Sequence, residues 1–220
     1  MPLEAVAADQ GPTFDAEFRR RLRDLLLWRR DVRRFRLDPL PDGLLDRLIA
    51  LACGAPSVGL SEPWRFVIVE DAARRAAVRA SFARCNAEAL RSQSPDRAAS
   101  YARLKLAGLD DAPVQLAVFA DHETAQGHGL GRKTMPEMID YSVVAAIYTL
   151  WLAARAEGIG LGWVSILDPL EISTSLDVPP DWKLIGYFCI GYPEAEDDVP
   201  DLQRKDWERR RSPDAFIVRR

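Results

Sequence analysis

The 220-residue chain has only three cysteines and two histidines, and it has no excess of basic residues. The cysteines lie far apart and form no CxxC pair, which indicates reduced thiols and argues against a disulfide framework. Because no cysteine lies close to them, the two histidines do not predict a metal site. Thirty basic residues against 33 acidic ones give a net charge of −3, so a nucleic-acid partner is not expected.

Long apolar runs are missing too. The longest, Val143–Ala154, is too short to span a bilayer and predicts a buried helix. The first eleven residues include Glu4 and Asp9 and no apolar run, which differs from a signal peptide. We therefore expect a cytoplasmic protein that makes no membrane contact.

Three common site motifs are also absent. Gly158, Gly160 and Gly162 begin a GxGxxG pattern, but position 163 is tryptophan and the glycines follow a predicted helix instead of a strand. The chain contains no Walker sequence and no GxSxG elbow. The sequence therefore favours neither a dinucleotide loop, nor a nucleoside triphosphate site, nor a serine hydrolase.

The apolar residues follow the pattern of one α+β domain. The length and the 48% hydrophobic content are sufficient for a single core. The spacing predicts helices within 14–28, 41–54, from 71 onward and 136–158, and strands within 64–69, 113–120, 161–166 and 184–190. Residues 1–13 are expected to be flexible, and 14–220 to form the domain, with an interrupted helical excursion at 92–111 and a charged C-terminal extension.

The predicted architecture is a three-layer α-β-α sandwich, with helices surrounding a mixed central sheet. The helix after Pro136 is apolar on more of its circumference than a surface helix needs. Such a helix is either enclosed in the monomer or buried in a dimer, and we favour a homodimer. Phe216–Val218 could add an edge strand or contact a partner.

The strongest local signal is a run of arginines at the end of the first predicted helix. The segment Arg29–Arg34 places four arginines around Asp31, and the planar guanidinium group suits bidentate binding of phosphate. A solvated helix end that complements the helix dipole would have the same composition. A carboxylate inside a phosphate site would weaken anion binding, so Asp31 needs a separate function there.

Two further segments carry weaker signals. The loop from Pro56 to Ser61 offers backbone N–H groups and hydroxyls, although a turn that requires proline, glycine and serine explains it as well. Trp163–Ser165 continues a strand after a glycine-rich turn. It is either a core strand or the support for a flat ring whose polar edge Ser165 contacts, and periodicity does not distinguish the two.

Together these segments resemble the flavin-dependent nitroreductase superfamily over about residues 14–210. The motifs that carry the resemblance are Arg29–Phe35, Val58–Phe66, Lys105–Leu109, Gly160–Leu167 and Ile190–Pro193. Within the superfamily, the chain is most similar to the 5,6-dimethylbenzimidazole synthase family, which forms the lower ligand of vitamin B12 from reduced FMN. Asp31, Trp163 and Ser165 are the residues that narrow the resemblance to this family.

The resemblance implies a homodimer with two FMN sites at the subunit interface and no metal. The residues it implies for FMN binding are Arg29, Arg30, Asp31, Val32, Arg33, Pro56, Ser57, Ser61, Lys105, Trp163, Val164 and Ser165. Arg29, Arg30 and Arg33 would hold the phosphate and the ribityl chain. The ring and ribityl side would be lined by Pro56, Ser57 and Ser61, and the ring would be flanked by Trp163, Val164 and Ser165. Either Arg204 or Lys205 would join the phosphate site, and the sequence does not distinguish them.

The implied reaction takes reduced FMN and O2 to 5,6-dimethylbenzimidazole and a four-carbon sugar phosphate. Asp31 is the candidate base at the ribityl C1′, Ser165 the candidate partner of the flavin edge, and 92–111 the candidate lid. No nicotinamide fingerprint is visible, so a separate flavin reductase is expected to supply reduced FMN. The alternatives are an NAD(P)H-dependent nitroreductase or quinone reductase, and a non-catalytic flavin-binding protein.

Overall fold

The computed structural model describes residues 11–102, 104 and 107–220. The helices are α1 (Ala16–Trp28), α2 (Leu44–Ala52), α3 (Ala72–Arg91), α4 (Pro95–Ala102), α5 (Gly108–Asp111), α6 (Met138–Ala156), α7 (Pro169–Leu176) and α8 (Asp201–Arg204). The strands are β1 (Trp64–Ile68), β2 (Val114–Asp121), β3 (Gly160–Val164) and β4 (Trp182–Gly191), with 3₁₀ turns at η1 (Val58–Leu60), η2 (Gln126–Gly129) and η3 (Pro213–Phe216). Most of the predicted flexible N-terminus and the predicted ligand Lys105 lie outside the described residues.

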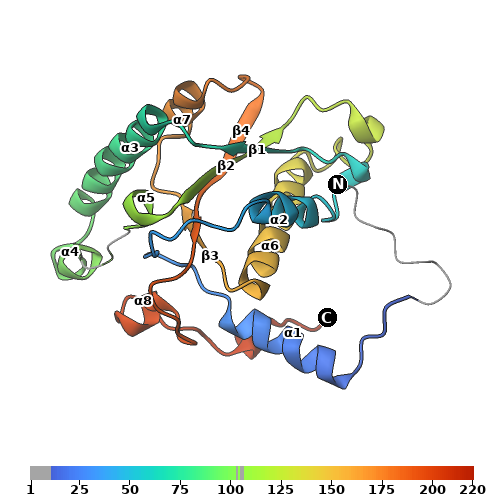
Figure 1. Cartoon of the computed structure of the whole chain (residues 1–220), viewed down its shortest axis with the longest axis horizontal. Coiled ribbons are helices and arrows are strands. Elements are labelled where there is room, and N and C mark those ends of the chain that lie inside the picture. Colours follow the sequence, from blue (N-terminus) through green and yellow to red (C-terminus); the bar gives the residue numbers. More distant parts are fainter. Residues whose placement is uncertain (1–10, 103, 105–106) are drawn as a thin grey trace.

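The four described strands form one sheet in the order β1-β2-β4-β3 (Figure 1). All three strand pairs are antiparallel. The parallel component of the predicted mixed sheet is, within the described part of the chain, an isolated bridge between Asp31 and Leu161. The segment after α1 therefore continues the sheet at the outer edge of β3.

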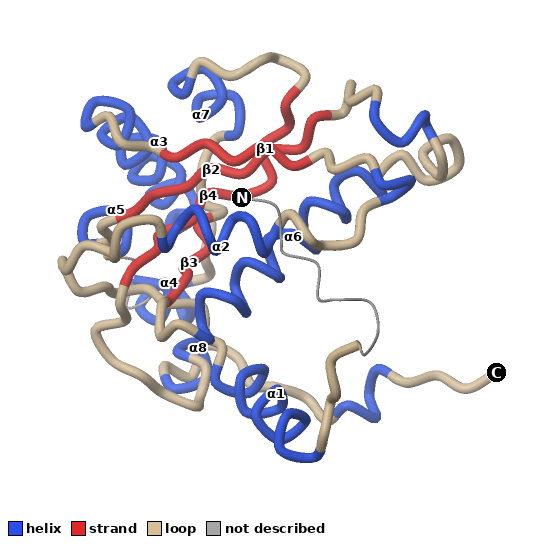
Figure 2. Tube along the Cα trace, turned by 45° about the vertical axis from the view of Figure 1, so that its right-hand side comes forward, coloured by secondary structure: helices blue, strands red, loops and turns tan. Residues whose placement is uncertain are grey.

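Helices cover both faces of the sheet, as Figures 1 and 2 show, so the predicted three-layer α-β-α arrangement is confirmed. Leu116, Val118 and Ala120 pack with α2 and α6, whereas Ala117 and Phe119 pack with α3, α5 and α7. Alternate residues of β2 are thus buried on opposite faces, which explains why this strand reads as a continuous apolar run.

Local signals explain where several helices begin. The Asp71 side chain accepts a hydrogen bond from the Arg74 N–H at 2.8 Å and caps α3, which begins where the sequence predicts a helix, from residue 71 onward. Asp15 caps α1 in the same way, through the Phe18 N–H at 2.7 Å. Beyond α6, Gly158 has φ +74°, a conformation that suits glycine after the end of a helix.

The segment predicted as an interrupted helical excursion consists largely of helices. α3 runs to Arg91, and α4 and α5 follow it. The Gln115 side-chain amide donates to the Leu109 carbonyl at 2.9 Å, and the Tyr187 hydroxyl donates to Gln115 Oε1 at 2.7 Å. This buried chain of hydrogen bonds anchors α5 to the sheet.

One of the two alternatives for Phe216–Val218 is wrong. These residues are exposed, Phe216 is the last residue of the 3₁₀ turn η3, and none of the three pairs with the sheet. The outer edge of β3 is already taken by the backbone of Asp31 and Val32, and the Arg211 guanidinium lies 5.5 Å from the Phe216 ring, which favours a local turn.

Two helices carry apolar side chains that a single chain leaves exposed. On α6, Tyr141, Val144 and Tyr148 share one face and are 40–53% exposed, while the opposite face is buried. α1 has no buried residue, although its apolar residues recur at helical spacing. No helix in the described part of the chain is long and apolar enough to cross a membrane.

Candidate functional site

The segment that follows α1 lies along the edge of β3. The Val32 N–H donates to the Leu161 carbonyl at 2.8 Å, and the Trp163 N–H donates to Asp31 Oδ1 at 2.8 Å. The other carboxylate oxygen, Oδ2, lies 3.7 Å from the Arg33 Nε. Asp31 is thus held in place mainly by the backbone of β3, and one of its oxygens stays available for a second function.

Glycines at 160 and 162 permit this close approach. A Cβ atom at Gly162 would lie 2.1 Å from the Val32 carbonyl oxygen, and one at Gly160 would lie 2.6 Å from Val32 Cγ2. Any larger side chain would push the segment away from the strand. Glycine at these two positions of β3 is therefore required for packing.

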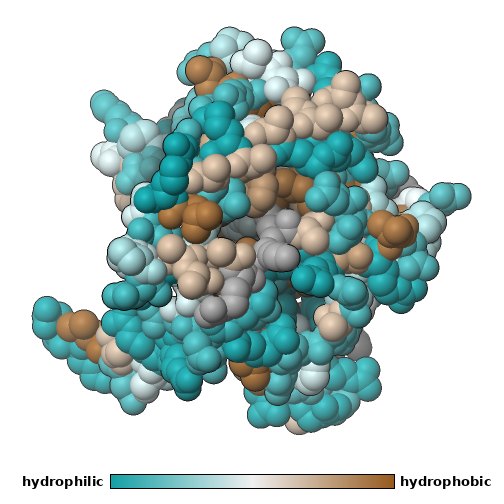
Figure 3. All heavy atoms as spheres, turned by 90° about the vertical axis from the view of Figure 1, so that its left-hand side faces the viewer, coloured by the Kyte–Doolittle hydropathy of each residue, from teal (hydrophilic) through white to brown (hydrophobic). Residues whose placement is uncertain are grey.

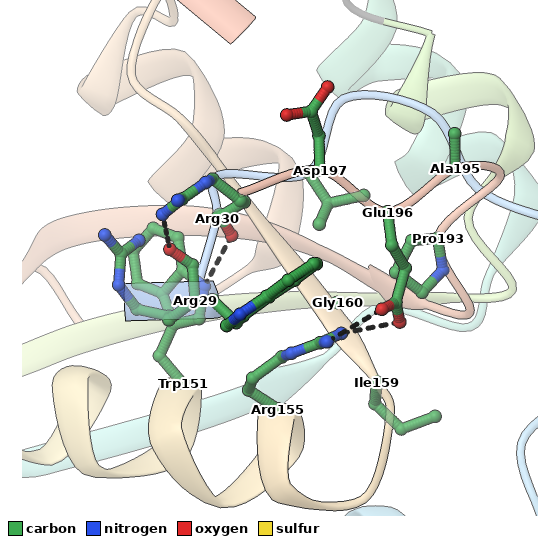
Figure 4. A pocket seen from close by; sticks show the side chains of 12 residues that line it. Arg29, Arg30, Trp151, Arg155, Ile159, Gly160, Pro193, Ala195, Glu196 and Asp197 are labelled. Carbon is green, nitrogen blue, oxygen red and sulfur yellow. Dashed lines mark hydrogen bonds and ion pairs between the residues drawn. The ribbon is translucent and has the colours of Figure 1, made fainter. Parts of the chain in front are cut away.

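Arg29 and Arg30 lie between α6 and the segment after β4 (Figure 4). The Arg29 guanidinium lies over the Trp151 ring, 5.0 Å from its centroid, and the Trp151 indole N–H donates to the Arg30 carbonyl at 3.1 Å. Figure 4 also shows Arg155 of α6 directed at Glu196, with two hydrogen bonds of 2.7 and 2.8 Å. These contacts fix the start of the arginine run and the segment after β4 to the same helix.

A cavity of about 120 Å³ beside this cluster has the composition of an anion site. The Nε atoms of Arg29 and Arg30 are buried and have no hydrogen-bond partner among the described residues. Burial lowers the pKa of Arg30, and the charges of Arg210 and Arg29 lower it further. The charged lining residues are Arg29, Arg30, Asp31, Arg33, Asp201 and Arg210. The four arginines outnumber the two aspartates, so a phosphate would offset the excess positive charge and supply further acceptors, and these residues fit the phosphate of FMN.

The C-terminal segment encloses an adjoining cavity, also of about 120 Å³. Arg204 and Lys205, the two candidates for a late basic residue at the phosphate site, both line this adjoining cavity, and neither lines the cavity beside Arg29 and Arg30. Each is paired there with a carboxylate: Lys205 Nζ lies 2.8 Å from Asp201 Oδ2, and Arg204 Nε lies 3.1 Å from Asp197 Oδ2. Arg210 was missed in the sequence, because it is one of three consecutive arginines in a charged tail and belongs to no motif.

A third cavity, of about 130 Å³, extends from Asp31 to the end of β3. The Trp163 ring packs against Trp151 and Phe188, and the Val164 side chain is 2% exposed, so the strand faces the cavity mainly with its backbone. Ser165 follows the strand and is exposed. The lining residues are Asp31, Arg33, Phe82, Asn86, Tyr101, Leu104, Trp163, Val164, Ser165 and Ile166. Both predicted catalytic residues therefore line one cavity.

The electrostatics of this cavity centre on Asp31. Burial raises the pKa of the Asp31 carboxyl, while the Trp163 N–H and the charges of Arg33 and Arg29 act in the opposite direction. A carboxyl group with a raised pKa in a cavity is a candidate for proton transfer. Within the described ranges, no group of three or more histidine, cysteine, aspartate or glutamate residues could hold a metal ion.

The predicted ring-side residues lie elsewhere in the chain. The Val58 N–H donates to Ser142 Oγ at 3.0 Å, which fixes the loop of Pro56 and Ser57 to the N-terminal part of α6, and Ser61 is buried beside this loop. The arginines contact Trp151, nine residues further along the helix, which corresponds to about 13 Å. A single chain therefore brings Arg29, Arg30, Arg33, Asp31 and Ser165 together but not Pro56, Ser57 and Ser61.

Comparisons with known proteins show the family and the fold. The family model described as Nitroreductase family matches residues 26–192. A 5,6-dimethylbenzimidazole synthase of Rhodospirillum rubrum is 56% identical over 91% of this chain and 95% of its own, and one of Rhodobacter capsulatus is 49% identical over 89% and 94%. A crystal structure of oxidized iodotyrosine deiodinase bound to FMN and 3-iodo-L-tyrosine is 26% identical, with a TM-score of 0.68 over 80% of this chain and 91% of its own. The resemblance found from the motifs is confirmed.

Proposed function

Because the chain belongs to the nitroreductase family, we propose that it binds FMN and uses O2 to break reduced FMN down to 5,6-dimethylbenzimidazole and a four-carbon sugar phosphate. The observation that carries this proposal is the position of Asp31, which lines two cavities. One is the arginine-rich cavity, lined by Arg29, Arg30, Arg33 and Arg210, and the other is the cavity lined by Ser165. A ligand with a phosphate at one end and a flat polar ring at the other fits two cavities that share a wall. The names of the synthase relatives support the same product.

The chain's own residues would hold the two ends of this ligand. Arg29, Arg30 and Arg33 would bind the phosphate through charge-assisted hydrogen bonds, and Arg210 would add a fourth positive charge. The backbone of Trp163–Ser165 would support the ring, with the Ser165 hydroxyl at its polar edge. α4 contributes Tyr101 to the same cavity wall, so we propose that α4 belongs to the lid that excludes water.

Asp31 would act as the base between the two ends. Its Oδ1 accepts the Trp163 N–H, so Oδ2 is the oxygen that would take a proton from the ribityl chain. A raised pKa makes this carboxylate a stronger proton acceptor than an exposed aspartate. Reduced FMN, when bound, supplies the electrons for O2 and the carbon atoms of both products.

We further infer that the active form is a homodimer. Pro56, Ser57 and Ser61 of a second copy would complete the site that one chain leaves without them. The exposed face of Tyr141, Val144 and Tyr148 lies on α6, the helix that contacts this loop through Ser142, and it offers an apolar surface for the second copy. Because no nicotinamide fingerprint is visible, a separate flavin reductase would supply reduced FMN.

The function is tested by exposing the protein, loaded with photoreduced FMN in the absence of air, to O2. Mass spectrometry should detect 5,6-dimethylbenzimidazole together with the loss of flavin. Intact oxidised FMN with peroxide alone would overturn the synthase proposal. Rapid reduction of bound FMN by NADPH would then identify a reductase, and its absence would leave a flavin-binding protein.

Arg33→Ala should weaken FMN binding about 10- to 100-fold, because one charge-assisted hydrogen bond contributes about 1.5–3 kcal/mol. Riboflavin, which lacks the phosphate, should bind this variant as it binds the wild type. Quenching of flavin fluorescence measures both affinities. Arg36→Ala, an exposed arginine outside the arginine-rich cavity, is the matched control. Unchanged FMN affinity in Arg33→Ala would contradict the phosphate assignment.

A further inference from the structure

Asn86 is the single asparagine of the sequence, and it lies in the interior of a helix. Its neighbours in α3 are mostly alanine and arginine, which favour helix more than asparagine does. The residue lines the cavity that contains Asp31 and Ser165. Helix propensity therefore does not explain asparagine at this position, whereas its place in the cavity wall offers a reason.

Tyr101 of α4 fixes the orientation of this amide. The Tyr101 hydroxyl donates to Asn86 Oδ1 at 2.8 Å, and Tyr101 lines the same cavity. Burial raises the pKa of Tyr101, so its hydroxyl remains protonated and able to donate. Because the amide oxygen accepts this bond, the two N–H donors of Asn86 are left for other acceptors.

The C-terminal segment in turn holds Tyr101. The Trp207 ring packs edge-on against the Tyr101 ring, with centroids 6.1 Å apart, and the Arg97 guanidinium lies 5.1 Å from the Trp207 centroid. On this side the wall of the cavity is built from α3 and α4, and the segment after α8 supports Tyr101 from behind without lining the cavity (Figure 3 shows the side of the molecule on which α3 and α4 lie).

We propose that Asn86 donates a hydrogen bond from its side-chain amide to an acceptor atom on the polar edge of the flavin ring, and that Tyr101 is the positioning residue that fixes this amide. The proposal rests on the function proposed above, since it requires a flavin in the cavity. Asn86 and Ser165 would then act on the ring, whereas the arginines act on the phosphate. FMN and riboflavin, which share the ring, should therefore respond equally to changes at Asn86.

The test compares Asn86→Ala, Tyr101→Phe and the control Cys85→Ala, a neighbouring position on α3 that does not line the cavity. Oxidised FMN and riboflavin are titrated against each protein, and the absorption bands of the bound flavin are recorded. Asn86→Ala should bind both flavins about tenfold more weakly and lose the band shift of the wild type. Tyr101→Phe should lose part of the shift in the flavin absorption bands, because the Asn86 amide is then free to rotate. Cys85→Ala should match the wild type.

Thermal unfolding separates this function from a structural one. Asn86→Ala gains helix propensity but loses the bond from Tyr101, so it should unfold no earlier than Tyr101→Phe, which loses the same bond, while it binds flavin less well than that variant. Wild-type affinity and wild-type bands in Asn86→Ala would overturn the inference and leave the proposed function intact. A wild-type protein that binds neither flavin would instead overturn the proposed function itself.

Discussion

Asp31→Asn is expected to retain FMN and to stop the formation of 5,6-dimethylbenzimidazole. Asparagine preserves the size of the side chain, and its Oδ1 can still accept the Trp163 N–H, so the segment should remain on β3. It cannot take a proton, and the loss of a general base costs about 10²- to 10⁴-fold in rate. The product formed in a single turnover with O2, set against FMN affinity, is the measurement.

Asp38→Asn is the matched control, because Asp38 is an exposed aspartate whose ion pair with Arg36 lies outside the cavities that Asp31 lines. It should turn over as the wild type does. Normal product formation by Asp31→Asn would remove Asp31 from the catalytic role. Loss of FMN together with the product would instead show that the carboxylate is needed to hold the segment.

The pH dependence of the reaction is an independent test of Asp31 as the base. Burial raises the pKa of this carboxyl, so its proton is lost at a higher pH than that of an exposed aspartate. The rate should therefore fall as the pH decreases through a value above the ordinary aspartate range, because the base becomes protonated. The residual rate of Asp31→Asn should not show this fall at low pH.

Gly162→Ala is expected to disrupt the site from within the sheet. The new Cβ would lie 2.1 Å from the Val32 carbonyl oxygen, so either the 31–33 segment or β3 must move. Overpacking of this kind costs about 1–3 kcal/mol or more. Because the same segment carries Asp31 and Arg33, FMN affinity should fall at least tenfold along with the free energy of unfolding.

Urea denaturation and flavin titration measure the two effects of Gly162→Ala separately. Gly11→Ala is the control, because a Cβ atom at this exposed residue would meet no heavy atom within 4 Å. If Gly162→Ala kept both the stability and the affinity of the wild type, the segment could not be packed against the strand as described.

Several features of the fold follow from local chemistry, and these were predicted well. The helix predicted from residue 71 onward begins there because the Asp71 carboxylate accepts a hydrogen bond from a free N–H group at the helix start. The apolar run in β2 predicts a buried strand because both of its faces are covered. Phe216–Val218 shows the limit of this reasoning, since an apolar triplet pairs with a sheet only where the fold brings it to a free edge.

For the candidate site too, the residue types could be predicted from the sequence, whereas the contacts between distant segments could not. The residue types in Arg29–Arg34 indicate anion binding from the sequence alone, because guanidinium chemistry does not depend on the fold. That Asp31 is held by the Trp163 N–H, and that Arg210 and Asn86 lie beside it, depends on segments more than fifty residues apart in sequence.

The sequence by itself determined the α+β class, the positions of the main elements, the family and the charge chemistry of the arginine run, because these depend on short-range periodicity and residue type. Only the tertiary structure decided which of these residues share a cavity. It also decided that the loop containing Ser57 contacts α6 at Ser142, whereas the arginines contact it at Trp151, about 13 Å further along the helix, because distances between segments arise from packing around a common core and not from spacing along the chain.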